Sequence, residues 1–391
     1  MTKQLKVDSV VNLAGTGKPN FPVSPTSGGA ALSTLNTHSY TSSATEPSSP
    51  KNGAIWWDSA NSKVYVYANG EFKEITLNTD YPSAYAATPA WSGDRALAAG
   101  GVSSQSTSYD DILYFNIAGS GGNSANFGDL VLFRYQGDAA GSSTRACFMG
   151  GYNGSQGSPR RDDIDYVTPS TTGNGTDFGN LTVGRSANSC CSNGTRALSV
   201  AGYGPSSYRD IVDYITIDTP GNAVDFGDLS AVGTGHGGSA GDATRAVVAG
   251  GIGASYSDTI EYFTYSTTGN ATDFGDLLYA ANRNAAVSDA TRSVFMGAAS
   301  STYHTPANAN MEYITTQTTG NGTDFGDLSG QYYGAAACEN ATKGVVIGDI
   351  SSSPYTGMEV ITIQTTSNGS DFGDLLENRG YEGMSTSGNP S

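Results

Sequence analysis

Residues 245–278 read RAVVAGGIGASYSDTIEYFTYSTTGNATDFGDLL, and variants of this stretch occur six times along the chain of 391 residues. The Phe-Gly-Asp-Leu near its end, or a one-residue variant of it, recurs at spacings between 47 and 51 residues. Its six copies begin at Phe127, Phe178, Phe226, Phe274, Phe325 and Phe372. Regular spacing over six copies indicates one supersecondary unit used six times.

Two further markers keep the same register. A basic residue recurs as Arg95, Arg145, Arg196, Arg245, Arg292 and Lys343. An aromatic residue follows it as Tyr114, Tyr166, Tyr214, Tyr262 and Tyr313, and Val360 replaces it in the sixth copy. The three markers together define six repeats of one design.

Each repeat predicts four short strands. Its apolar, β-branched and aromatic residues stand in short runs, and the runs are separated by Gly, Asn, Asp and Ser, which favour turns. Four strands in about 49 residues fit one blade of a β-propeller, in which neighbouring blades bury the faces that a single blade exposes. We therefore predict an all-β fold, with a six-bladed propeller over residues 79–391.

The repeats resemble kelch repeats. The shared features are the repeated Arg, the acid before the spaced Tyr, and the doublets Gly100-Gly101, Gly150-Gly151 and Gly250-Gly251. The resemblance extends from Arg95 to Thr386, although the Phe of Phe-Gly-Asp-Leu stands where a kelch blade has Trp. It implies a kelch-like propeller.

The ends of the repeat array predict how the ring closes. Residues 379–386 follow the sixth Phe-Gly-Asp-Leu and match the first strand of a blade, whereas the first repeat begins near Asp94 without a clear first strand. We therefore expect residues 379–386 to complete the first blade. In the competing interpretation, Tyr85 to Trp91 form that strand and the C-terminal segment lies outside the ring.

The first 78 residues have a different character. Residues 1–50 are rich in Ser, Thr, Gly and Pro and predict an extended attachment arm. Residues 51–78 predict a small β-meander of three strands, with Asn69-Gly70 at its second turn. Because three strands are marginal alone and adjacent Trp56 and Trp57 face opposite sides, we expect packing on other chains and a multimeric state.

Two of these N-terminal stretches resemble bacteriophage proteins. Residues 6–22 are similar to the attachment region of tail-fibre and other appendage proteins, of marine and cyanobacterial phages especially, and residues 50–72 are similar to a small β-module common in such proteins. The resemblance implies a virion structural protein, such as a tail fibre, a neck or capsid appendage or a decoration, that docks on other virion proteins. The candidate docking residues are Val7, Val10, Phe21, Trp56 and Trp57.

Charge and hydropathy exclude several classes of protein. The net charge is −17; residues 1–78 carry +1, and the remainder carries 13 basic and 31 acidic residues. Such an acidic body repels nucleic acid and anionic membranes. No apolar run approaches the length of a membrane span, and the first 15 residues lack a secretory signal. We expect synthesis in a host cytoplasm and a final location in the virion.

The sequence offers little for catalysis. The three histidines occupy non-equivalent positions in the repeats and do not suggest a catalytic triad. Asp-Phe-Gly recurs five times without the other motifs of a kinase. We expect no enzyme activity; the alternative is a propeller-fold enzyme, either carbohydrate-active with two carboxylates or metal-dependent.

We also expect no cofactor. The repeated acids around Phe-Gly-Asp carry the oxygen ligands that calcium prefers, but their near-identity in every repeat favours a structural role, either capping a turn or pairing with the repeated Arg. The four cysteines are too few for a disulfide framework, and we expect them to act as small buried residues.

The loops between the second and third strands of each repeat carry the candidate binding surface. They combine Tyr with Ser, Gly, Asn and occasional Arg, a composition typical of binding loops. We expect them to meet on one face of the ring and to bind a glycan or protein of the host surface, although soluble loops that only decorate the particle remain an open alternative. The candidate residues are Tyr109, Tyr152, Arg160, Arg161, Tyr203, Tyr208, Arg209, Tyr256, Tyr303, His304 and Tyr355.

Overall fold

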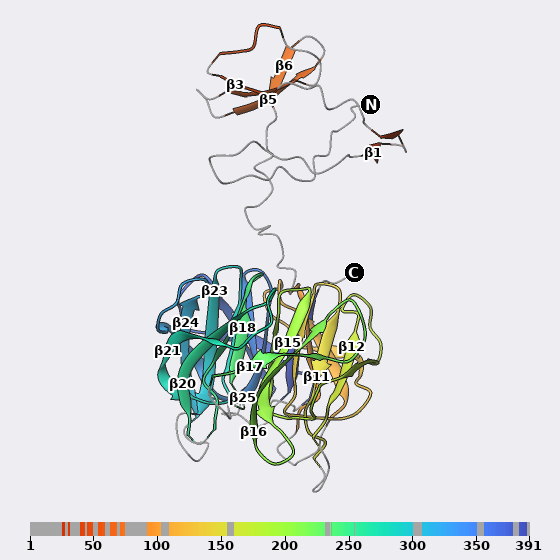
Figure 1. The fold of residues 1–391 in the computed structure, drawn as a ribbon, viewed down its shortest axis with the longest axis vertical. Coiled ribbons are helices and arrows are strands. Elements are labelled where there is room, and N and C mark those ends of the chain that lie inside the picture. Colours follow the sequence, from red (N-terminus) through yellow and green to blue (C-terminus); the bar gives the residue numbers. More distant parts are fainter. Residues whose placement is uncertain are drawn as a thin grey trace. The chain divides into compact units, whose positions relative to one another are not determined.

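The computed structural model divides the chain into two compact units, residues 1–85 and 86–391. It describes residues 26–27, 30–31, 40–43, 45–49, 54–58, 63–68, 71–74, 92–102, 109–154, 160–230, 235, 237–253, 255–299, 307–349, 356–377 and 383–388. Every regular element among these residues is a β-strand (Figure 1). None of the described segments forms a helix that is long and apolar enough to cross a bilayer.

The second unit is a six-bladed β-propeller, as the repeat predicted. Blade 1 contains β29 (Met384–Gly388), β7 (Arg95–Ala99), β8 (Asp111–Asn116) and β9 (Ala125–Asp129). Blade 2 contains β10 (Asp138–Gly141), β11 (Ala146–Met149), β12 (Asp163–Val167) and β13 (Thr176–Asn180). Blade 3 contains β14 (Ser189–Ser192), β15 (Arg196–Tyr203), β16 (Tyr208–Thr216) and β17 (Val224–Asp228).

The remaining blades follow the same antiparallel order. Blade 4 contains β18 (Gly238–Gly241), β19 (Arg245–Ala249), β20 (Ser257–Thr264) and β21 (Thr272–Ala281). Blades 5 and 6 share the long strand β25, so that they form one seven-stranded sheet. Its strands are β22 (Ala285–Ser288), β23 (Arg292–Ala299), β24 (Ala307–Thr315), β25 (Thr323–Glu339), β26 (Lys343–Asp349), β27 (Gly357–Thr362) and β28 (Ser370–Asp374).

The C-terminal strand closes the ring. β29 pairs with β7 from Met384 opposite Ala99 to Gly388 opposite Arg95, which confirms that the C-terminal segment completes blade 1. The strand begins five residues later than the predicted start at residue 379. Residues 85–91, the competing first strand, lie outside the described residues. The side chain of Met384 is fully buried between blades 1 and 2.

The Phe of each Phe-Gly-Asp motif lies in the core between two neighbouring blades. Six hydrophobic clusters are present among the described residues, and each contains one such Phe, 2–3% exposed. The cluster of Phe226, for example, joins Leu198 and Val212 of blade 3 to Val248 and Phe263 of blade 4. The repeated Phe therefore packs one blade against the next, which is why the motif recurs once per blade.

The Gly and the Asp of Phe-Gly-Asp bring the backbones of neighbouring blades together. In blade 4, the carbonyl oxygen of Phe274 accepts the N–H of Gly320, and the N–H of Asp276 donates to Oδ1 of Asn321, both in the next blade. A Cβ at Gly275 would lie 2.4 Å from the carbonyl oxygen of Gly320. The Asn contact is present at all six blade junctions, through Asn123, Asn174, Asn222, Asn270, Asn321 and Asn368.

A second contact holds the linker that follows each motif. An acid on the third strand of the next blade accepts a backbone N–H of that linker, as when Ser230 donates to Glu261 over 3.0 Å. The acids are Asp165, Asp213, Glu261, Glu312 and Glu359. At the junction of blades 6 and 1, the hydroxyl of Ser124 takes this place. The acid before the spaced Tyr is therefore a structural residue.

The repeated Arg binds the next blade rather than a repeated acid, which excludes one of the two structural roles considered for the acids. Arg245 does not pair with a repeated acid; its guanidinium lies 4.1 Å from the ring centroid of Tyr262 and donates to the carbonyl oxygen of Thr316 in the next blade. The same arrangement recurs in blades 1, 2, 3 and 5. In blade 6, where Val360 replaces the Tyr, Lys343 donates to the carbonyl oxygen of Gly119.

The first unit contains a sheet larger than predicted. The strands β4 (Ile55–Asp58), β5 (Lys63–Ala68) and β6 (Glu71–Glu74) form the expected meander, and β3 (Tyr40–Ser43) adds a fourth strand parallel to β4. β3 comes from the segment predicted as an extended arm. The same segment holds the short pair β1 (Thr26–Ser27) and β2 (Ala30–Ala31).

Trp56 packs inside this small sheet. Its side chain is 7% exposed, stacks on Tyr65 and donates its indole N–H to Ser43. Of the other predicted docking residues, Val7, Val10 and Phe21 lie outside the described residues, as does the side chain of Trp57. The docking role of this unit stays a prediction.

Candidate binding surface

The two ends of the ring differ in what they present. The loop face carries the loops between the second and third strands of each blade and the linkers between blades. The turn face, at the other end, carries the tight turns between the remaining strands. The chain enters the second unit at the turn face, where the N–H of Gly93 donates to Oγ of Ser387 and the carbonyl oxygen of Asp94 accepts the N–H of Ile117.

A continuous row of aromatic rings and one guanidinium crosses blades 2 and 3 on the loop face. The rings of Tyr135 and Tyr152 meet edge to face with centroids 5.5 Å apart. The guanidinium carbon of Arg160 lies 5.4 Å from the centroid of Tyr152 and 4.3 Å from that of Tyr203. Tyr203 in turn meets Tyr208 edge to face at 4.9 Å. We call these five residues the Tyr-Arg row.

The far end of the Tyr-Arg row reaches blade 4 and the linker to blade 5. Burial raises the pKa of the Tyr208 phenol, and the positive charge of Arg283, in that linker, acts against this shift; Tyr203 and Tyr256 add to it. A Cβ at Gly235 would lie 2.7 Å from the Tyr208 ring. The half-buried Tyr208 ring therefore lies against the linker between blades 3 and 4.

The row rests on backbone pairs at the edge of the ring. Tyr135 and Tyr152 exchange backbone hydrogen bonds of 3.0 and 2.7 Å, and Ser186 and Tyr203 do the same at the next junction. At the following junction Gly235 pairs with Ile252. The aromatic row ends there, because neither residue of that pair carries a ring.

Two buried ion pairs lie beneath the row. Arg134, one residue before Tyr135, places Nη2 3.0 Å from Oδ2 of Asp165. Arg185, one residue before Ser186, places Nη1 3.0 Å from Oδ2 of Asp213. Both arginine side chains are fully buried, and burial lowers the pKa of each. The pairs fix the linkers that carry the row.

The structure brings together some of the predicted residues and leaves others apart. Tyr152, Arg160, Tyr203 and Tyr208 belong to the row, and Tyr256 lies near its end. Arg161 is paired with Asp163 at 2.6 Å. Tyr109 and Arg209 are half-buried on the same face, Tyr109 in blade 1, apart from the row, and Arg209 beside Tyr208. Tyr303, His304 and Tyr355 lie outside the described residues.

Two residues of this surface were not predicted. Tyr135 and Arg283 stand in the linkers between blades rather than in the loops that the prediction considered. The available signal was their position after the Phe-Gly-Asp motif, since each linker must cross the loop face to reach the next inner strand.

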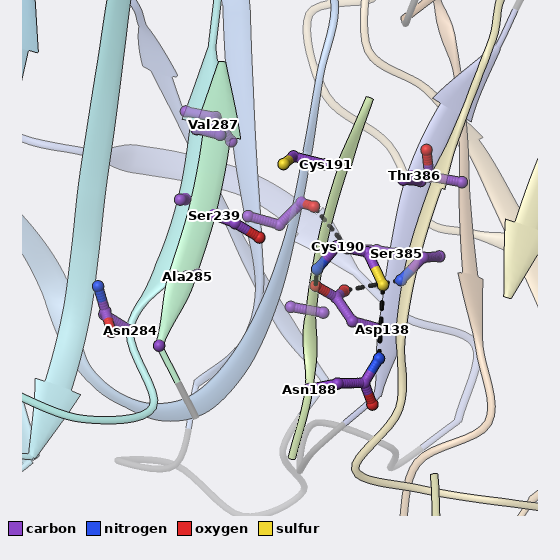
Figure 2. Close-up of a pocket in the computed structure, with 18 of the residues that line it drawn as sticks. Asp138, Asn188, Cys190, Cys191, Ser239, Asn284, Ala285, Val287, Ser385 and Thr386 are labelled. Carbon is purple, nitrogen blue, oxygen red and sulfur yellow. Dashed lines mark hydrogen bonds between the residues drawn. The ribbon is translucent and has the colours of Figure 1, made fainter. Parts of the chain in front are cut away.

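The central channel is the main cavity of the described residues. Its walls are the first strands of the blades, and its volume is about 110 Å³, enough for several water molecules. Asp138 and Cys190 lie side by side on neighbouring inner strands (Figure 2), and the N–H of Cys190 donates to Asp138 Oδ2 over 2.7 Å. Glu339 lies at the turn-face end of the channel.

Burial makes both acids of the channel harder to ionise. Burial raises the pKa of Asp138 to about 7, against the effect of the N–H groups of Ala139 and Cys190. Burial, and then the charge of Asp138, raise the pKa of Glu339 to about 8. Burial also raises the pKa of all four cysteine thiols, so they remain unreactive at neutral pH.

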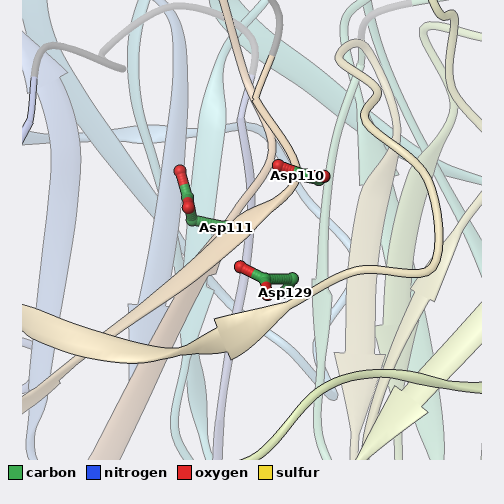
Figure 3. A group of neighbouring side chains, drawn as sticks. All are labelled: Asp110, Asp111 and Asp129. Atoms are coloured by element: carbon green, nitrogen blue, oxygen red, sulfur yellow. The ribbon is translucent and has the colours of Figure 1, made fainter.

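A small acidic group lies at the loop face of blade 1. The carboxylates of Asp110, Asp111 and Asp129 gather within 4.8 Å of one another (Figure 3). Three carboxylates supply fewer oxygens than the six to eight that Ca²⁺ takes, and Asp110 is exposed. The group fits the surface acidity of the ring and does not define a metal site by itself.

Comparisons with known proteins do not assign a family. No protein-family model matches the chain, and no curated protein matches its sequence.

Proposed function

We propose that the protein is a non-enzymatic structural component of a bacteriophage virion, whose N-terminal unit docks on other virion proteins and whose propeller presents the loop face to a glycan or protein of the host surface. The observation that carries the proposal is the Tyr-Arg row. Aromatic side chains with a polar tip supply contact area at low entropic cost, and a guanidinium fixed between two rings adds a preorganised charge.

The entry point of the chain supports the same assignment. The chain enters the ring at the turn face, opposite the loop face that carries the row. The resemblance of residues 6–22 and 50–72 to phage appendage proteins supplies the virion context.

The proposal is tested by binding of the full-length protein to host cells. We expect saturable binding that is lost in Tyr203→Ala, because this change removes the ring between Arg160 and Tyr208. Val224→Ala, at an exposed apolar position of the turn face, is the control and should bind as the wild type does. Melting temperatures of both variants check that they fold. Equal binding by Tyr203→Ala, or turnover of a bound sugar, would contradict the proposal.

A further inference from the structure

The basic residues of the propeller are distributed in a way that points to one kind of ligand. Of the 13 basic residues after residue 78, six lie at the turn face and donate to carbonyl oxygens. Two, Arg134 and Arg185, are fully buried in ion pairs. The remaining four in the described part of the ring are Arg160, Arg161, Arg209 and Arg283, and Arg379 lies outside it.

These four cations occupy one sector of the loop face. Arg160 and Arg161 end the loop of blade 2, Arg209 begins the third strand of blade 3, and Arg283 stands in the linker between blades 4 and 5. The charges of Arg160 and Arg283 both act on the Tyr208 phenol. Asp162, Asp163 and Asp210 stand among these arginines, and Arg161 is paired with Asp163, so recognition of an anion depends on Arg160 rather than on the net charge of the sector.

The geometry of Arg160 suits an anion next to a flat apolar group. Its side chain is half-buried, with Tyr152 and Tyr203 within 5.4 Å of its guanidinium carbon. Its Nε is buried and has no hydrogen-bond partner among the described residues, so the terminal Nη groups are the ones that meet a ligand. A guanidinium held in this way keeps a fixed fork for a carboxylate or phosphate, while the neighbouring phenol rings offer a face on which the C–H groups of a sugar can pack.

We propose that the Tyr-Arg row, with Arg283, binds an acidic glycan through its carboxylate or phosphate groups, a specification that rests on the proposed function.

The experiment measures affinities of the full-length protein for three soluble probes by titration calorimetry. The probes are hexagalacturonate, a glycerol-phosphate oligomer and neutral maltohexaose. We expect one or both acidic probes to bind at least about 10-fold more tightly than maltohexaose, and the tighter acidic probe identifies carboxylate or phosphate as the recognised group. Arg160→Gln should weaken that probe by about 10-fold, the loss of one charge-assisted contact.

Two further variants separate charge from geometry and from folding. Lys343→Gln removes the same charge at the turn face and should change the affinity by no more than about two-fold. Arg160→Lys keeps the charge but loses the planar fork, so an intermediate affinity is expected. Equal affinity for acidic and neutral probes, or equal effects of Arg160→Gln and Lys343→Gln, would overturn the inference. Host-cell binding that still depends on Tyr203 would then leave the proposed function intact, whereas absence of binding to cells and to every probe would reject both.

Discussion

Arg185→Met tests the account of how the loop face is held in place. The side chain of Arg185 is fully buried; it pairs with Asp213 at 3.0 Å and donates to the carbonyl oxygen of Ser199 at 3.0 Å. Removal of one partner of a buried ion pair costs about 3–5 kcal/mol, since the other charge stays buried. Asp213 keeps the backbone N–H and the hydroxyl of Thr182 as donors. We therefore expect the free energy of unfolding to fall by about 3 kcal/mol, the lower end of that range.

The assay is denaturant unfolding of full-length wild type and variant, with the free energy of unfolding as the readout. Arg245→Met is the matched control, because it also loses a carbonyl hydrogen bond, here together with a ring contact, but leaves no buried carboxylate unpaired. Its expected cost is about 1–2 kcal/mol. The double variant Arg185→Met, Asp213→Asn removes both charges and keeps a side-chain acceptor for the N–H of Thr182, so it should recover part of the loss.

The reasoning would be refuted if Arg185→Met cost no more than Arg245→Met, or if the double variant were less stable than Arg185→Met. Either result would mean that the linker beneath Tyr203 is held by the backbone pairs alone.

Three more predictions concern the ring. First, the free energy of unfolding should fall as pH rises from about 4 to 8. Asp138 and Glu339 have folded-state pKa values of about 7 and about 8, above those of the unfolded chain, so the folded state binds more protons in this range. Asp138→Asn should flatten this pH profile and raise the free energy of unfolding at pH 8 by about 2–4 kcal/mol, whereas an unchanged profile would contradict the role of the channel acids. Second, Gly275→Ala should lower the free energy of unfolding by well over the roughly 1 kcal/mol of a left-handed backbone position, because its Cβ would meet the carbonyl oxygen of Gly320 at 2.4 Å. Gly269→Ala is the control, since Gly269 has φ +156° and nothing within 4 Å of the Cβ. Equal melting temperatures of the two variants would refute the close approach. Third, Met384→Ala should cost about 2–5 kcal/mol and expose β29 to proteolysis, whereas an unchanged digestion pattern would argue against its role in closure.

The fold could be predicted because the same packing contacts recur in all six repeats. A Phe, a Gly and an Asp recur together, since each blade needs a buried ring, a close backbone approach and an N–H for the neighbouring Asn at the same place. The ends of the array then indicated closure by the C-terminal strand. Pairing of the repeated Arg with a repeated acid was one of two open roles for the acids, and the period alone could not exclude it, because a guanidinium can bind a carbonyl oxygen or an acid.

The binding surface could be predicted only in part. Tyr in the variable loops gave Tyr152, Tyr203 and Tyr208, but Tyr135 joins them from a linker, and its place depends on how the blades pack. The buried pairs of Arg134 and Arg185 escaped prediction for the same reason. In the first unit, Tyr40–Ser43 is a polar segment without alternation, so its addition to the small sheet depends on pairing with β4 rather than on any local signal.

The most direct test of the central claim is the orientation of the protein on an assembled particle, measured by electron cryo-microscopy of virions that incorporate the chain. The account predicts density for the N-terminal unit against another virion protein, with Tyr152, Arg160 and Tyr203 facing outward. A ring whose loop face is covered by another virion protein, with the turn face outward, would contradict it.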